Sequence, residues 1–274
     1  MIPFHCNRRD RTNTPVLYNA EIWAYAEALV GDYKPQLLKE PGKINPIHFL
    51  ESYLGATVEF QDIYYPAGEP AIAGATVFDA GLLRVFDREH QCTRLISIKA
   101  NTVIIDNATM EDYNEGFANF TGLHEAGHFC MHGEVYRRDP NQLSLFNGHP
   151  NWANAVCCRK TAMGYIHGGG RRLNPYQMQE HQANTFAAFA AMPRQTFIPF
   201  AKELNRKEGF KDGIFVLENW AGWEEWSRYE KVCETLARAY GVSFTATDIH
   251  MRQLGLQMRR FEYEQMMGQM TVNL

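Results

Sequence analysis

The sequence predicts an α+β fold in which two central helices pack against a small, mainly antiparallel sheet. Three observations support this class. Short β-branched runs separated by turn residues fill residues 57–105, helical periodicity follows at 114–132 and again at 174–191, and no internal repeat is present. Of the 274 residues, 45% are hydrophobic, which is enough to bury one sizeable core and excludes a disordered chain.

The N-terminal part of the chain predicts two short helices and then strands. Residues 18–30 place apolar side chains on one helical stripe. Asn45 and Pro46 resemble an N-cap followed by proline at the first helical position, and Gly55 stands where a left-handed C-terminal cap favours glycine. We interpret the β-branched runs that follow as a meander of four or five strands, at 57–63, 75–78, 83–86, 95–98 and 102–105.

The second half of the chain is expected to be helical around a long insertion. A helix at 114–132 is followed by 133–174, which is rich in turn formers and predicts an irregular insertion. An Asn-Pro pair then begins a helix that ends at Ala191, shortly before a proline. We expect residues 1–197 to form the first domain, insertion included, and residues 198–274 to form an all-helical C-terminal region.

Charge and hydropathy narrow the function classes. The 27 basic and 31 acidic residues give a net charge of −4, so the chain has no net attraction to nucleic acid or anionic membrane. The longest apolar run, 186–193, is shorter than the roughly 20 residues that a membrane helix needs. The first residues lack the charged-then-apolar order of a signal peptide. We therefore expect a cytoplasmic protein with no membrane partner.

The six cysteines are too few for a disulfide framework and contain no C-x-x-C pair. We interpret them as reduced structural thiols. The adjacent Cys157 and Cys158 have an alternative interpretation, in which they bind a soft metal or sense redox state.

The most informative motif is His124-Glu125-Ala126-Gly127-His128, an H-E-x-x-H pattern on an expected helix. Four helical residues advance about 6 Å and turn about 400°, so both imidazoles lie on one face, as a shared metal requires. Glu125 lies about 100° round the helix, beside the metal. A carboxylate there can take the proton of a water that Zn²⁺ has acidified, which predicts a zinc site with Glu125 as the general base.

A zinc site of this kind needs a third protein ligand, and two residues compete for that role. His132 is about 12 Å along the helix axis from His124 and about 80° away in rotation, so one ion does not easily reach both. Glu180 arrives from a second helix and is the preferred ligand. Asn184 shares its face and is expected to hydrogen-bond a ligating histidine from behind, whereas His132 is expected to support the ligands or to be structural.

These two motifs together resemble the ImmA/IrrE family of zinc metallopeptidases. The resemblance rests on Phe120-Thr121 before the H-E-x-x-H motif and on Glu180, Ala183, Asn184, Phe186, Ala187, Met192 and Pro193. It implies a zincin-like fold in which His124, His128 and Glu180 hold Zn²⁺ and Glu125 is the catalytic base. It also implies a gluzincin-like endopeptidase whose intracellular substrate is a regulatory protein, typically a helix-turn-helix transcriptional repressor.

A second function class remains open for the C-terminal region. Residues 230–258 read as helix, Gly241-Val242-Ser243 and helix, which resembles a DNA-binding helix-turn-helix. The register is imperfect, because Thr247 and His250 occupy positions of apolar core residues and Asp248 is expected on the exposed face. The alternative function is thus a DNA-binding regulator that retains a structural metal site, although DNA binding is not favoured.

A peptidase also needs a donor that stabilises the developing oxyanion. Four residues near the motif carry suitable side chains. They are Tyr136, His149, Tyr165 and His167, and the sequence does not choose among them.

Overall fold

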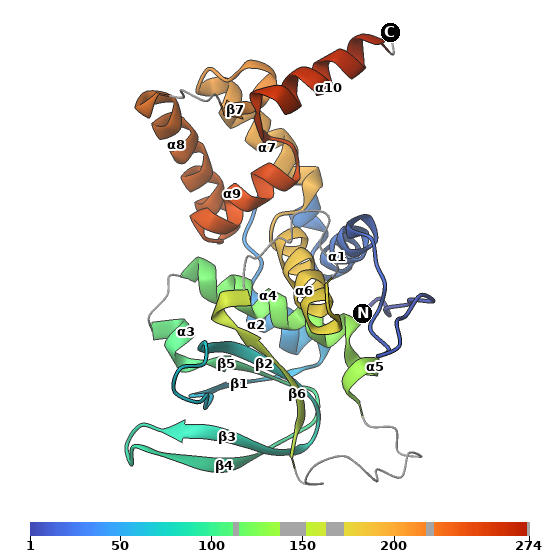
Figure 1. Ribbon diagram of the computed structural model, residues 1–274, viewed down its shortest axis with the longest axis vertical. Helices are drawn as coiled ribbons and strands as arrows, with labels where there is room; N and C mark the ends of the chain where they lie inside the picture. Colours follow the sequence, from blue (N-terminus) through green and yellow to red (C-terminus); the bar gives the residue numbers. More distant parts are fainter. Residues whose placement is uncertain (112–114, 138–151, 163–172, 218–221, 273–274) are drawn as a thin grey trace.

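The computed structural model describes residues 1–111, 115–137, 152–162, 173–217 and 222–272 (Figure 1). It confirms the mixed α+β class. A small sheet lies at one end of the molecule, the C-terminal helices lie at the other, and the helices α4 and α6 lie between them (Figure 1). Among the described residues, no helix is both long and apolar enough to cross a membrane.

The main sheet has the strand order β1-β5-β2-β6, with β1 and β5 parallel and the other neighbours antiparallel. Its strands are β1 (Thr57–Gln61), β2 (Ile72–Asp79), β5 (Thr102–Asp106) and β6 (Asn154–Arg159). The strands between them in sequence, β3 (Gly81–Asp87) and β4 (Cys92–Ile98), pair with each other as a separate hairpin.

The predicted meander is therefore wrong, and burial explains why. Every residue of β5 is buried, so this strand takes a central position with both faces covered. Most of β4 is exposed, which suits a hairpin outside the main sheet. The chain passes through that hairpin and returns to insert β5 between β1 and β2.

The region 133–174 is not wholly irregular, which corrects the predicted insertion. Its described residues form α5 (Gly133–Tyr136), β6 and the 3-10 turn η3 (Lys160–Ala162). Strand β6 joins the edge of the main sheet, and its Cys158 lies opposite Gly74 of β2. The turn formers on both sides of the short run Ala155–Cys158 concealed this strand in the sequence.

The N-terminal helices form as their capping residues predict. These elements are α1 (Asn19–Tyr33), η1 (Pro35–Leu38), α2 (Pro46–His48) and η2 (Phe49–Leu54). The Asn45 side chain accepts a hydrogen bond from the backbone N–H of His48, 3.0 Å away. Gly55 ends η2 with φ +74°, a left-handed conformation that favours glycine.

Two helices form the centre of the molecule, preceded by the short α3 (Asn107–Glu111). They are α4 (Glu115–Met131) and α6 (Pro175–Ala191). Helix α4 packs against β2 and β5 on one side and against α6 on another, and α6 also contacts α1. Residues 120–128 of α4 are buried without interruption, so this helix is enclosed on all sides and is not an amphipathic surface helix.

The C-terminal region is mostly helical, but it also contains a two-stranded parallel pair, so the all-helical prediction is wrong in that detail. Its elements are α7 (Arg194–Lys207), η4 (Lys211–Gly213), β7 (Phe215–Leu217), α8 (Trp223–Tyr240), α9 (Phe244–Gln253), β8 (Gln257–Arg259) and α10 (Arg260–Val272). The expected boundary between 197 and 198 falls inside α7, and the largest apolar cluster holds buried residues from both sides of it. The division into two domains stays a prediction.

Close backbone contact joins the start of α4 to the C-terminal region. A Cβ at Gly116 would lie 2.3 Å from the carbonyl carbon of Val242, which is backbone and cannot rotate away. We expect Gly116→Ala to lower the free energy of unfolding by about 1–3 kcal/mol, because the overpacked contact must separate. Denaturant unfolding measures this, with Gly268→Ala as the control, since no atom of the described residues lies within 4 Å of a Cβ there. Equal stability of both variants and the unmodified protein would contradict the close contact.

His250 predicts a pH dependence of stability. Its ring packs edge-on against Phe189 and Phe197, and burial lowers its pKa to about 4. Between that pH and the ordinary histidine pKa of about 6.5, the unfolded chain binds a proton that the folded protein does not. Stability due to His250 is therefore complete above about pH 6.5 and falls by up to about 1.4 kcal/mol per pH unit on acidification.

The test compares metal-free protein with His250→Gln, whose amide retains a donor for the carbonyl of Met192, 3.0 Å from His250 Nε2. Unfolding free energies at several pH values between about 4 and 6.5 give the two slopes. We expect the unfolding free energy of His250→Gln to change less steeply with pH, and the difference in slope should correspond to close to one proton. Identical slopes would show that His250 is charged in the folded protein.

Candidate metal centre

The helices α4 and α6 bring the predicted site residues together. His124, Glu125 and His128 lie on α4, and Glu180 and Asn184 lie on α6. All five side chains are buried. The centre lies between two packed helices and the sheet, as the sequence predicts.

The closeness of the two helices depends on one glycine. A Cβ at Gly127 would lie 3.1 Å from the Cα of Ala183 and 3.2 Å from the side chain of Phe186. Contacts this short leave little room for any larger residue at position 127. The motif glycine therefore lets α6 approach α4 closely enough for Glu180 to reach the histidines.

The three predicted ligands converge on one point. The Nε2 atoms of His124 and His128 are 3.0 Å apart. The carboxylate oxygens of Glu180 lie 3.6 Å from His124 Nε2 and 3.3 Å from His128 Nε2. Two nitrogens bound to one tetrahedral Zn²⁺ at 2.0–2.1 Å would be about 3.3 Å apart, so this spacing suits a shared ion.

Hydrogen bonds on the far side of each imidazole assign its protons. Asn184 Oδ1 lies 2.9 Å from His124 Nδ1 and can only accept, so His124 carries its proton on Nδ1. The Nε2 atom of His124 therefore keeps a free lone pair. Asn184 thus occupies the supporting position expected from its spacing to Glu180.

A longer chain of hydrogen bonds orients His128. The Gln182 amide donates to the carbonyl of Pro15, 2.7 Å away, which leaves its Oε1 to accept from His132 Nε2 at 2.9 Å. His132 Nδ1 is then an acceptor and receives the proton of His128 Nδ1, also 2.9 Å away. The Nε2 of His128 therefore has a free lone pair as well. His132 lies behind His128, as the helix geometry predicts.

Burial sets the charge of these groups. Loss of solvent lowers the pKa of His124 and of His128 to about 3, so both imidazoles are neutral at pH 7. The same cause raises the pKa of the Glu180 carboxyl. Within the described part of the chain, neither carboxylate oxygen of Glu180 has a hydrogen-bond partner of good geometry. Neutral nitrogens and an unpartnered carboxylate make a donor set suited to a cation.

Glu125 lies against β2, where the sheet leaves room for it. Thr76 Oγ1 donates to Glu125 Oε2, 2.7 Å away, while Oε1 has no hydrogen-bond partner among the residues that the structure describes. A Cβ at Gly74 would lie only 2.8 Å from Oε1. Burial raises the pKa of Glu125 well above its ordinary value.

The structure adds two residues that the sequence analysis did not place at the site. The Sγ of Cys158, a ring nitrogen of His124 and a carboxylate oxygen of Glu180 all lie within 4.8 Å of one another, and this buried group could hold a metal ion. Tyr176 of α6 also lies near Glu180 and donates to the carbonyl of Cys157, 3.1 Å away. Cys158 was missed because its strand was not predicted.

The oxyanion candidates are only partly placed. The hydroxyl of Tyr136 donates to Gln179 on α6, and burial raises its pKa to about 12, so it stays a proton donor at pH 7. His149, Tyr165 and His167 lie outside the described residues.

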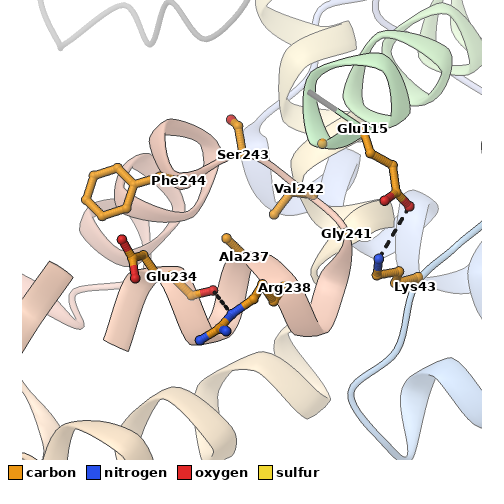
Figure 2. A pocket seen from close by; sticks show the side chains of 10 residues that line it. Lys43, Glu115, Glu234, Ala237, Arg238, Gly241, Val242, Ser243 and Phe244 are labelled. Atoms are coloured by element: carbon orange, nitrogen blue, oxygen red, sulfur yellow. Dashed lines mark hydrogen bonds and ion pairs between the residues drawn. The ribbon is translucent and has the colours of Figure 1, made fainter. Parts of the chain in front are cut away.

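The helix pair at 230–258 packs against α4. Its turn lies against the start of α4, where Asn119 donates to the carbonyl of Gly241, 3.0 Å away. Figure 2 shows the pocket at this junction, about 370 Å³ in volume, with the ion pair of Lys43 and Glu115 on one side. On α4, the lining of this pocket begins at Glu115, nine residues before His124. Nine helical residues span about 13 Å, so this pocket is separate from the metal centre.

The second helix of that pair presents little surface for reading DNA. Asp248, expected on the exposed face, is buried and accepts a hydrogen bond from Tyr229. In α9 only Thr245 and Arg252 are exposed, and Arg252 pairs with Asp248. A recognition helix needs several free polar side chains for base edges. This arrangement favours a packing role over the alternative DNA-binding function.

Comparison with known proteins does not identify the chain. No protein-family model matches it, and no curated protein matches it. The resemblance to the ImmA/IrrE family therefore rests on the motif residues alone and stays a prediction.

Removing one ligand or one supporting residue should separate their roles. We expect Glu180→Ala to weaken zinc binding by more than about 100-fold, because it removes a donor atom. We expect His132→Ala to weaken zinc binding by about 10–100-fold, because it only frees His128 to rotate. Competition with a chromophoric chelator measures both affinities. Glu203→Ala removes an exposed carboxylate and serves as the control. A site emptied by His132→Ala but not by Glu180→Ala would contradict the two-helix ligand set.

Proposed function

We propose that the chain is a zinc-dependent endopeptidase with a zincin-like fold and a gluzincin-like donor set. His124, His128 and Glu180 hold Zn²⁺, and Glu125 is the general base. One observation carries the proposal. The Nε2 atoms of the two imidazoles lie 3.0 Å apart, their protons are assigned to Nδ1, and they face a buried carboxylate that has no hydrogen-bond partner among the described residues. A cation is the group that satisfies all of these atoms at once.

The donor types select among cations. Two neutral imidazoles and one carboxylate form the donor set of many catalytic zinc sites, whereas Ca²⁺ and Mg²⁺ prefer oxygen ligands. The hydrogen bonds from Asn184 and His132 fix the ring orientations that such a site needs. When bound, Zn²⁺ would supply Lewis acidity toward water and toward a peptide carbonyl.

Glu125 has the properties of a general base in this setting. Thr76 holds its Oε2, so Oε1 is the atom available to take a proton from the attacking water and later to give it to the departing amine. Burial raises the pKa of the Glu125 carboxyl, which makes its carboxylate a stronger proton acceptor. Gly74 leaves the space beside Oε1 free of a side chain.

Strand β6 offers a place for an extended substrate. It is an edge strand of the sheet, and its Cys158 reaches the metal centre. An edge strand binds an extended peptide through main-chain hydrogen bonds. A substrate paired with β6 would run past Glu125 and the metal ligands.

The substrate class rests on the family resemblance. The ImmA/IrrE family acts on helix-turn-helix repressors, and we propose a transcriptional repressor as the protein substrate here. Selection of one protein partner is also expected because unselective proteolysis inside a cell would be harmful.

Glu125→Gln tests this function directly. The variant should keep zinc and lose hydrolysis, because it removes the base without changing a metal ligand. The chain is co-expressed with the helix-turn-helix repressor encoded nearest to its gene, and a discrete repressor fragment is sought by mass spectrometry. We expect the fragment with the unmodified chain and none with Glu125→Gln, while both contain about one zinc ion by elemental analysis.

The control is Glu203→Gln, which changes an exposed carboxylate far from the motif in sequence. Cleavage by Glu125→Gln at the unmodified rate would exclude Glu125 as the base. Rapid, unselective digestion of casein would contradict the single-partner substrate.

A further inference from the structure

Cys158 lies at the metal centre, although the proposed mechanism does not use it. Its side chain is fully buried on the edge strand β6. Its Sγ, a ring nitrogen of His124 and a carboxylate oxygen of Glu180 lie within 4.8 Å of one another. The thiol therefore approaches two of the three predicted ligands, His124 and Glu180, from the sheet side.

Strand geometry separates Cys158 from its neighbour. Successive residues of a strand point to opposite faces, and β6 follows this alternation, with Val156 and Cys158 buried and Cys157 partly exposed. Cys158 pairs with Gly74, the residue whose missing side chain leaves room for Glu125. The two cysteines therefore have different surroundings despite their adjacency.

The unpartnered carboxylate of Glu180 is an independent indication that a ligand belongs here. Glu180 is 4% exposed, and neither of its oxygens has a hydrogen-bond partner of good geometry among the described residues. The Cys158 thiol lies close enough to interact with this carboxylate. A thiol and a carboxylate in this position can share a cation once the thiol loses its proton.

The charge of the ion also allows thiolate ligation. The complex of Zn²⁺ with two neutral histidines and one carboxylate keeps a net charge of +1, which attracts a thiolate ligand. Thiolate sulfur is also among the ligands that zinc binds best, and the ion itself promotes loss of the thiol proton.

We propose that Cys158 is a fourth protein ligand of the metal, which occupies the position open to water and so slows hydrolysis. This inference rests on the proposed zinc site. Catalytic zinc sites keep one position open for water, whereas sites with four protein ligands are closed. Loss of the Cys158 ligand leaves His124, His128 and Glu180 with one open position, which is the arrangement that hydrolysis needs.

Cobalt substitution tests the ligand directly. The metal-free protein is loaded with Co²⁺, whose thiolate complexes absorb in the near ultraviolet through sulfur-to-metal charge transfer. We expect this band in the unmodified protein and in Cys157→Ser, which is the matched control. We expect it to be absent in Cys158→Ser and in Cys158→Ala, the second variant guarding against failure of the first to fold.

Zinc affinity and hydrolysis supply the second readout. Cys158→Ala should weaken zinc binding by at least about 10-fold. Losing a ligand should reduce the affinity at least as much as losing a residue that only hydrogen-bonds a ligand. Its zinc-loaded form should cleave the repressor faster than the unmodified chain. An unmodified protein that binds Co²⁺ without the charge-transfer band overturns the inference and leaves the zinc site intact. An unmodified protein that binds neither Co²⁺ nor Zn²⁺ overturns the proposed function itself.

Discussion

The contact between α4 and α6 at Gly127 is the constraint on which the rest of the structure depends. With no side chain at this position, the Cα of Ala183 comes within 3.1 Å of where a Cβ would be. A larger residue would push α6 outward, and Glu180 would move away from both imidazoles. The small residue inside the H-E-x-x-H motif therefore matters as much as its polar ones, because it sets the distance between the helices that supply the ligands.

Placing so many polar groups in the core requires hydrogen bonds that reach well beyond the centre. The chain from His128 through His132 and Gln182 ends on the carbonyl of Pro15, in the N-terminal segment. Each bond fixes the proton position of the next, so a main-chain carbonyl far away in sequence determines which nitrogen of His128 is free. Residues that never approach the metal thus control the chemistry of a ligand.

The helical half of the site could be predicted from the sequence, because helix geometry is local. The spacing of His124 and His128 gives their relative placement from 3.6 residues per turn, and the Asn-Pro pairs at 45 and 174 begin helices as expected. The sheet half could not be predicted. Strand order depends on contacts between segments far apart in sequence, so neither the insertion of β5 between β1 and β2 nor the edge position of β6 follows from periodicity.

Because helix placement is predictable from the sequence and sheet placement is not, a motif identifies the site residues on the helices but not those on the sheet. The helices supply the histidines, which the H-E-x-x-H spacing locates, and Glu180, which the pattern of the second helix indicates. The sheet supplies Thr76 and Cys158, which bound the same space from the opposite side. The sheet residues affect how the helix residues act, since Thr76 binds one oxygen of Glu125 and leaves the other free, and Cys158 is the proposed fourth metal ligand. The motif therefore indicates which reaction the helix residues suit, while the strand register determines which sheet residues lie beside them.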